Sequence, residues 1–199
     1  MKILVFSDTH NYLDNAREVL RRIGGQMDMV LHLGDHDTDA MELKKEFPSL
    51  PFHYVLGNND YSWDTPDKKM VFAGGKKLLL VHGHKQRVYW NYDSISYWAE
   101  EQGADVVLFG HTHRPVYDDR GRVMLFNPGS ISMPRGGTPP TFGILTIEEN
   151  GRMEGAIMEY HSDMPFCRGK GCFLQPRRMV SGLYCVKNSF FPDFSEKKP

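Results

Sequence analysis

Residues 106–113 read Val106-Val107-Leu108-Phe109-Gly110-His111-Thr112-His113, an apolar run followed at once by glycine and two closely spaced histidines. A short β-branched run that ends in glycine and polar residues is typical of a buried strand that leads into a loop. Two imidazoles one residue apart at the end of such a strand can both point past the edge of the sheet. This stretch therefore predicts a polar site beyond the carboxyl end of a buried strand.

Four further apolar runs end in the same way. They are 3–6, followed by Asp8 and His10; 29–33, followed by Asp35; 53–56, followed by Asn58; and 78–81, followed by His82 and His84. In open α/β sheets, ligands bind beyond the carboxyl ends of the strands. Carboxylate and imidazole donors suit divalent first-row metal ions, whereas zinc-finger and iron–sulfur sites need more thiolates than this chain has.

The order of the apolar patterns predicts an α/β fold. Strands at 3–6, 29–33 and 53–56 alternate with helices at 13–23 and 40–47, which favours parallel βαβ units with right-handed crossovers. Asp14 is expected to cap the first helix. The second half adds a helix at 94–101 and hairpins that turn at 74–75, 119–121 and 150–151. Two packed sheets covered by helices would accommodate both halves.

Composition narrows the class of protein. A chain of 199 residues can build one substantial core, and its net charge of −1 gives no large field for nucleic acid. The three cysteines all follow residue 160, which is not a secreted disulfide framework and fits a reducing cytosol. We find no signal-peptide pattern and no apolar run near the roughly 20 residues that span a bilayer. A cytoplasmic protein is expected.

The last residues differ in character from the rest. Residues 162–199 carry seven Lys or Arg against three Asp or Glu and have no clear period. We expect a domain at 1–161 followed by a basic, flexible extension at 162–199. Zinc held by Cys167, Cys172 and Cys185 with one more ligand, or docking of the basic tail on RNA or an acidic partner, remain alternatives to an irregular tail with free thiols.

Five ordered motifs carry a resemblance to a known family. They are Asp8-Thr9-His10, Gly34-Asp35, Gly57-Asn58-Asn59-Asp60, Val81-His82-Gly83-His84 and Gly110-His111-Thr112-His113. Together they resemble the motifs of the calcineurin-like metallophosphoesterases. The stretch Asn127-Pro128-Gly129-Ser130 is similar to the small YfcE-like phosphodiesterase branch of that superfamily. The likeness covers residues 1 to about 160.

The resemblance implies a fold, an activity and a ligand set. The fold would be a four-layer α/β/β/α sandwich. The activity would be hydrolysis of a small phosphodiester by a metal-bound hydroxide at a dinuclear site. Asp35 would bridge the two ions. Asp8, His10 and His113 would hold the first ion, and Asn58, His82 and His111 the second, while His84 competes with His82 for one place.

Four further residues are candidates for contact with the substrate or for a part in the reaction. Asn59 stands where the wider superfamily often has a histidine; its amide can donate a hydrogen bond but cannot deliver a proton. Asp60 is expected to orient a ligand or a substrate-side group. Arg135 could bind a phosphate oxygen, although a solvated loop arginine is an equal alternative. His36, beside Asp35, is either an acid for the leaving group or a loop residue without a role.

The exposed aromatic residues and the reaction leave alternatives open. A group of aromatic side chains near the Asn58 and His82 loops predicts either a stacking wall or, favoured here, a homodimer interface: Tyr61, Trp63, Tyr89, Trp90, Tyr92, Tyr97 and Trp98. A phosphomonoesterase would use the same site, and a non-catalytic scaffold would resemble the retromer subunit Vps29. Mn²⁺ is the expected ion, with Ni²⁺, Fe²⁺, Mg²⁺ and Zn²⁺ as alternatives.

Overall fold

The computed structural model of the chain describes residues 1–162. Apart from Ser162, the extension expected at 162–199 lies outside the described residues, and so do its three cysteines. The proposed domain boundary therefore stays a prediction. Within residues 1–162, no helix combines the length and the apolar composition needed to cross a membrane.

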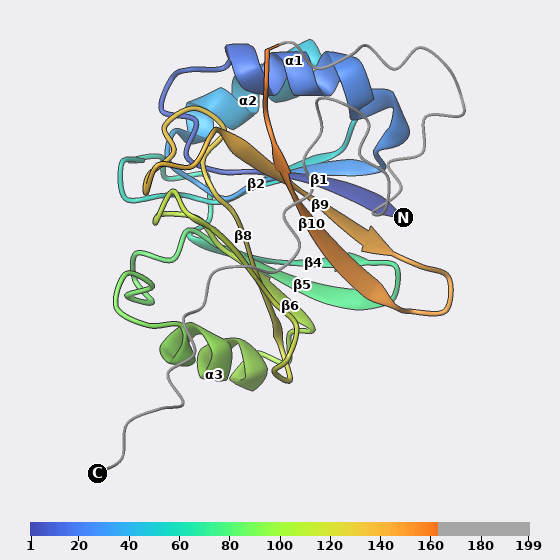
Figure 1. Cartoon of the computed structure of the whole chain (residues 1–199), viewed down its shortest axis with the longest axis vertical. Coiled ribbons are helices and arrows are strands. Elements are labelled where there is room, and N and C mark those ends of the chain that lie inside the picture. Colours follow the sequence, from blue (N-terminus) through green and yellow to red (C-terminus); the bar gives the residue numbers. More distant parts are fainter. Residues whose placement is uncertain (163–199) are drawn as a thin grey trace.

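Within these residues, ten strands form two five-stranded sheets (Figure 1). The first has the order β10-β9-β1-β2-β3, with β1 at Lys2–Phe6, β2 at Met29–His32, β3 at Phe52–Tyr54, β9 at Thr141–Ile147 and β10 at Met153–Glu159. The second has the order β4-β5-β6-β8-β7, with β4 at Lys68–Ala73, β5 at Lys76–Val81, β6 at Val106–Leu108, β7 at Pro115–Asp118 and β8 at Met124–Pro128. The helices are α1 at Asp14–Ile23, α2 at Asp37–Glu46 and α3 at Asp93–Glu101, and a 3₁₀ turn, η1, covers Gly24–Gln26.

Each sheet mixes parallel and antiparallel pairs. β1, β2 and β3 are parallel to one another, as the alternation of strand and helix patterns predicts. β5, β6 and β8 form the parallel part of the second sheet. The three hairpins expected from glycine-containing turns are present as the antiparallel pairs β4–β5, β7–β8 and β9–β10.

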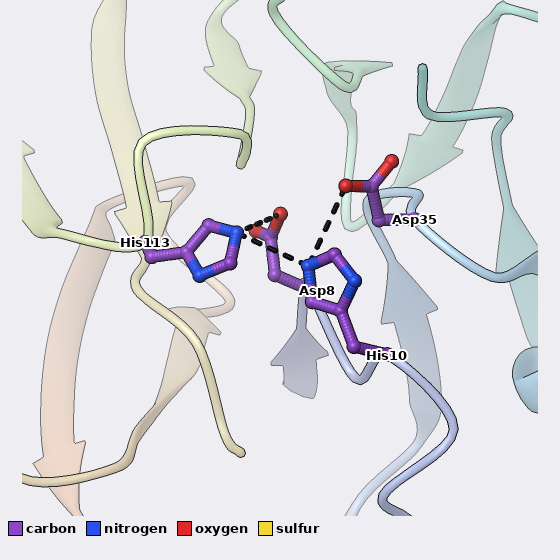
Figure 2. Close-up of side chains that lie close together, drawn as sticks. All are labelled: Asp8, His10, Asp35 and His113. Carbon is purple, nitrogen blue, oxygen red and sulfur yellow. Dashed lines mark hydrogen bonds and ion pairs between the residues drawn. The ribbon is translucent and has the colours of Figure 1, made fainter. Parts of the chain in front are cut away.

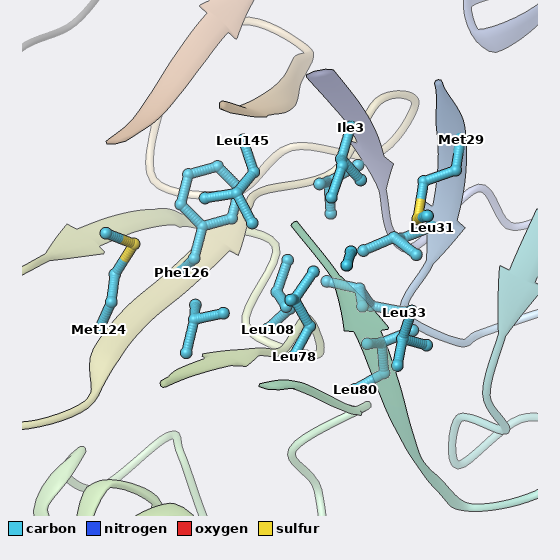
Figure 3. Close-up of a cluster of buried hydrophobic side chains, with 14 of the residues drawn as sticks. Ile3, Met29, Leu31, Leu33, Leu78, Leu80, Leu108, Met124, Phe126 and Leu145 are labelled. Atoms are coloured by element: carbon cyan, nitrogen blue, oxygen red, sulfur yellow. The ribbon is translucent and has the colours of Figure 1, made fainter. Parts of the chain in front are cut away.

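The sheets pack face to face and helices cover their outer faces (Figure 1). Ile3 of β1 shares the buried cluster between the sheets with Leu78 and Leu108 (Figure 3). The next residue, Leu4, belongs instead to the cluster under α1 and α2, because successive side chains of a strand point to opposite faces. Ile95 of α3 packs in a third cluster on the outer face of the second sheet. The predicted α/β/β/α sandwich is confirmed, and burial on both faces explains the continuous apolar runs of the central strands.

The start of α1 differs from the prediction. Asp14 is the first helical residue rather than the N-cap, and Leu13 occupies the N-cap position without a side-chain capping bond. Leu13 is 5% exposed and packs in the core beneath α1, so apolar burial rather than a polar cap fixes this entry to the helix. Asp14 still lies in the first turn, where a carboxylate interacts favourably with the helix dipole.

Candidate metal centre

The loops after five parallel strands meet at one edge of the packed sheets. They carry all seven side chains expected as ligands: Asp8 and His10 after β1, Asp35 after β2, Asn58 after β3, His82 after β5, and His111 and His113 after β6. Parallel strands end at the same edge, and the two sheets lie face to face, so both sheets contribute to a single site.

Four of these side chains form a first group. Asp8, His10, Asp35 and His113 each offer a ligand atom, and these atoms lie within 4.8 Å of one another. His113 Nε2 is 3.2 Å from Asp8 Oδ1, and His10 Nε2 is 3.5 Å from Asp35 Oδ2 (Figure 2). The Nε2 atoms of His10 and His113 are 3.1 Å apart. Donor atoms from both sheets therefore converge on one point.

A second group lies on the other side of Asp35. His82 Nε2 is 3.1 Å from Asn58 Oδ1 and 3.3 Å from Asp35 Oδ1. The ring of His111 lies edge-on to that of His82, with 5.0 Å between ring centroids. Asp35 thus presents Oδ1 to His82 and Oδ2 to His10. A carboxylate so placed has one oxygen for each of two ions.

Backbone carbonyls fix which histidine nitrogens face the site. His113 Nδ1 lies 2.5 Å from the carbonyl oxygen of Met133, and His82 Nδ1 lies 2.7 Å from that of Leu33. A carbonyl oxygen only accepts, so each Nδ1 must carry the hydrogen and donate it. Nε2 is then the atom left to bind a metal, and the carbonyl partner holds the ring in that orientation.

The Asp8 carboxylate fits a cation better than it fits the polar groups around it. Asp8 Oδ1 is buried and has no hydrogen-bond partner within residues 1–162. Asp8 Oδ2 accepts hydrogen bonds from Ser7 Oγ and the His111 amide. In the same part of the chain, the ion-pair partners of Asp8 and Asp35 are all histidines. A buried carboxylate oxygen is costly unless a proton or a metal ion neutralises it, and this oxygen and imidazole donor set suits a divalent metal.

The histidine pKa values agree with metal binding. Burial lowers the pKa of His111 to about 4 and also lowers the pKa of His10, so both rings are neutral near pH 7, the form that binds a metal. Burial also acts to lower the pKa of His113, but the close contact with the Asp8 carboxylate and its negative charge outweigh burial and raise it.

The ligand loops have an unusual backbone. Five of the seven side chains come from non-glycine residues in the left-handed region, with φ of 56° at Asp8, 49° at His10, 57° at Asp35, 68° at His111 and 56° at His113. Such residues cost of order 1–3 kcal/mol each and persist only where the surrounding structure holds them. The strained backbone of these loops therefore lowers the stability of the fold and orients these side chains towards one point.

Comparison with known proteins identifies the family. A model described as the calcineurin-like phosphoesterase superfamily domain matches residues 1–150. The chain belongs to this superfamily. The probable metallophosphoesterase YsnB of Bacillus subtilis is 36% identical over 152 residues, covering 75% of this chain and 86% of YsnB. The phosphodiesterase MJ0936 of Methanocaldococcus jannaschii is 31% identical over 167 residues, covering 75% of this chain and 95% of MJ0936.

A solved structure of wild-type Vps29 complexed with Zn²⁺ from Entamoeba histolytica has a TM-score of 0.70. It is 19% identical and covers 94% of this chain and 97% of the Vps29 chain, which shows the shared fold alone. The relatives named as metallophosphoesterases and phosphodiesterases, together with the family match, make the chain a metal-dependent phosphoesterase.

Asn59 and Asp60 of this phosphoesterase lie beside the second group. The amide and the side-chain Nδ2 of Asn59 donate to the two oxygens of Asp35, at 3.1 and 2.8 Å. Asp60 instead accepts from the backbone amides of Asp37, at 2.9 Å, and Gly57, at 2.7 Å. Asn59 therefore contacts a candidate ligand directly, whereas Asp60 ties the loop after β3 to the start of α2.

Arg135 and Tyr89 lie together at the rim of the site. The Arg135 guanidinium donates to the Tyr89 hydroxyl, and its amide donates to the carbonyl of His113. The Tyr89 hydroxyl donates to the carbonyl of His111, and the two rings meet edge-on at 4.8 Å. Tyr89 was expected only as part of an aromatic group, and the sequence carries no signal for its contact with Arg135.

His84 and His36, whose roles the sequence leaves open, lie beside the candidate ligands. His84 has its ring 5.5 Å from that of His82 and 6.0 Å from that of His111, so it stands beside the second group. His36 lies edge-on to His10, with ring centroids 5.3 Å apart. Between His82 and His84, only His82 has an ion-pair contact with Asp35.

Sequence reasoning missed the link between Thr9 and His32. His32 is 1% exposed, and its Nε2 is 3.0 Å from Thr9 Oγ1. Thr9 Oγ1 in turn donates to the carbonyl of Asp35, so Nε2 of His32 is the donor to Thr9. This chain of bonds ties the loop after β1 to the loop after β2. The available signal was a lone histidine inside the otherwise apolar run of β2.

We expect acid to destabilise the metal-free protein partly through His32. Burial lowers the pKa of His32 from 6.5, so below about pH 6.5 the unfolded chain binds a proton that the folded chain does not. Stability is therefore full above this pH and falls as the pH drops towards the folded pKa. Urea unfolding at pH 7.5 and pH 5.5 should show a smaller loss of stability in His32→Gln than in the wild type. An identical loss in both proteins would contradict this assignment.

Proposed function

We propose that this phosphoesterase hydrolyses small phosphodiesters with two divalent metal ions, of which Mn²⁺ is the expected one. Asp8, His10 and His113 would hold the first ion, Asn58, His82 and His111 would hold the second, and Asp35 would contact both. The observation that supports this most directly is the position of Asp35, whose two oxygens face histidines of different groups. When bound, the ions would neutralise phosphate charge and lower the pKa of a coordinated water.

The charge of the site favours an anionic substrate. Two carboxylates and an otherwise neutral set of imidazole and amide donors would leave two divalent ions with a net positive charge. Asn59 holds both oxygens of Asp35, which keeps that carboxylate aimed at the two groups. Asp60 contributes at a distance, because its bonds to Gly57 and Asp37 fix the loop that presents Asn58.

The leaving group receives no proton from Asn59, because an amide donates a hydrogen bond but does not ionise near neutral pH. We therefore expect faster turnover of esters with good leaving groups. The preference for a diester over a monoester is supported by the relative named as a phosphodiesterase, MJ0936.

Arg135 is proposed to bind a phosphate oxygen. Its guanidinium lies at the rim, and its amide donates to the carbonyl of the candidate ligand His113. Arg135→Ala is expected to raise KM for bis(p-nitrophenyl) phosphate about 10-fold and to leave kcat nearly unchanged, because a charge-assisted hydrogen bond to the ground state is lost. Arg122→Ala, in which the lost arginine is 85% exposed and pairs with Glu100, is the control and should change neither constant. An unchanged KM in Arg135→Ala would mean that Arg135 does not bind the substrate and is a solvated loop residue.

The proposed activity is tested by hydrolysis assays on metal-stripped protein with each divalent ion added back. Metal-dependent release from bis(p-nitrophenyl) phosphate, with little from p-nitrophenyl phosphate, is the expected result. Stronger release from the monoester would make the protein a phosphomonoesterase. No release with any ion, although two ions bind by calorimetry, would favour the scaffold that resembles Vps29.

The oligomeric state and the compartment are separate proposals. Trp63 is fully exposed, Tyr61 is 90% exposed and Trp90 is 85% exposed, and large exposed aromatics favour a surface that a second copy covers. We propose a homodimer, to be tested by light scattering after gel filtration. A cytoplasmic location is proposed from cysteine usage, and nucleic acid is not an expected partner.

A further inference from the structure

The segment from Asn127 to Met133 crosses from the second sheet to the first. Asn127 is in β8, and the chain continues beyond the segment into β9 of the first sheet. Ile131, in the middle, is fully buried in the core beneath α1, and its carbonyl accepts from Asn15 Nδ2 of that helix at 2.8 Å. The Ser130 carbonyl accepts from the Thr141 amide at 2.9 Å. The segment is therefore anchored independently of the metal site.

Two serines of this segment hold the loop after β1. Ser130 Oγ donates to the Asp8 carbonyl at 2.8 Å and accepts from the Met133 amide at 2.7 Å. Ser132 Oγ lies 2.7 Å from the Thr9 carbonyl and 3.2 Å from the Asp8 carbonyl, and its one hydroxyl hydrogen is shared between these two oxygens. Both hydroxyls thus act on the backbone of a ligand whose φ is in the left-handed region.

The other end of the segment holds the loop after β6. Asn127 Nδ2 donates to the Gly110 carbonyl at 2.9 Å and to Thr112 Oγ1 at 3.1 Å. The Met133 carbonyl accepts from His113 Nδ1 and so selects the nitrogen that faces the site. One short segment therefore contacts the backbone or side chains of both loops that supply the first group.

We infer that residues 127–133 form a clamp that sets the separation of Asp8 from His113, with Ser132 as a positioning residue for the first metal ion. Asp8 and His113 belong to loops of different sheets, so local structure in either loop cannot fix the distance between them. The bond from the His111 amide to Asp8 Oδ2 links the two loops directly. The clamp adds a second constraint, because it binds both loops and is itself fixed in the core. Ser132 never contacts the ion and acts through the carbonyls of Thr9 and Asp8. The inference rests on the proposed metal site.

Ser132 is the residue to change, because it is half-buried and its hydroxyl does not also organise the clamp as that of Ser130 does. The probe is Co²⁺, whose visible absorption reports coordination geometry, together with calorimetric Co²⁺ affinity. Ser132→Ala is expected to weaken one of the two Co²⁺ sites by about 10-fold or more and to change its absorption spectrum, as losses of groups that orient metal ligands do. Ser132→Thr, which keeps the hydroxyl, should retain most of the wild-type affinity.

The outcomes separate this inference from the proposed function. Ser94→Ala, at an exposed position of α3, is the matched control and should bind Co²⁺ as the wild type does. If the wild type binds no Co²⁺, the proposed metal site itself is wrong. If the wild type binds two ions and Ser132→Ala binds them with the same affinity and spectrum, the clamp does not position the ligands. A lower Tm without a change in Co²⁺ binding, or equal losses in the Ala and Thr variants, would also overturn the role of the Ser132 hydroxyl.

Discussion

Asp35→Asn is expected to lower kcat for bis(p-nitrophenyl) phosphate by about 10³-fold or more, because it removes the carboxylate shared by both groups. Asp35 Oδ1 is 3.3 Å from His82 Nε2, and Oδ2 is 3.5 Å from His10 Nε2. Asparagine has nearly the same shape, but it loses the negative charge and turns an NH₂ group towards one ion position. We therefore expect one bound ion to be lost together with turnover, while the fold is retained.

The measurement combines kcat with the number of ions bound by calorimetry. Asp118→Asn is the control, because that carboxylate pairs with Arg120 near the β7–β8 turn rather than in the site. It should keep both the activity and the metal content of the wild type. Wild-type kcat in Asp35→Asn would show that no shared carboxylate is needed.

Gly57→Ala is expected to abolish metal binding and to reduce kcat about as much as Asp35→Asn does. A Cβ at Gly57 would overlap Asp35 Oδ1 and the Asp35 amide, and would lie 2.9 Å from Asp35 Cα. Two of these three atoms are backbone of a residue with φ of 57°, so Asp35 cannot move aside without losing its orientation. Forced overpacking costs typically 1–3 kcal/mol, so we also expect a lower Tm.

Gly25→Ala is the matched control, because a Cβ there would have no heavy atom within 4 Å beyond its neighbours in the chain and the backbone of its own helical turn. Its activity should equal that of the wild type, and its stability should be equal or slightly higher, since alanine restricts the unfolded chain. Tm, Co²⁺ affinity and kcat are measured for both variants. Normal Co²⁺ binding in Gly57→Ala would mean that the loop after β3 can shift without disturbing Asp35.

The layers of the fold could be predicted because burial on both sheet faces produces strong, continuous apolar signals. The run from Ile3 to Phe6 splits into residues that face the other sheet and residues that face α1, yet every position is apolar. The turn sequences Gly74-Gly75 and Asn150-Gly151 likewise predicted the antiparallel pairs β4–β5 and β9–β10. The prediction that Asp14 is the N-cap of the first helix was wrong, because a buried Leu13, not a polar cap, decides where the chain enters the helix.

The position of the candidate site could also be predicted, because polar residues directly after buried strands must lie at the sheet edge. The orientation of its side chains could not be predicted. Left-handed φ values at His10 and His111 leave no mark in a sequence, since neither residue is glycine. The bonds of Ser132 to Thr9 and Asp8 span more than 120 residues and join the loop after β1 to the crossover between β8 and β9, so no local pattern reveals them. From the sequence, Gly57 is an ordinary turn residue. The structure shows that it lies against Asp35, which leaves no room for a side chain.

We propose that this chain holds two metal ions that share Asp35. Anomalous diffraction from crystals of the protein soaked in Mn²⁺ tests it most directly. Two peaks about 3.5–4 Å apart, the usual spacing of dinuclear sites, are expected. One peak should lie against Asp8, His10 and His113, the other against Asn58, His82 and His111, with Asp35 touching both. A single peak, or peaks away from Asp35, would contradict a pair of ions that share this carboxylate.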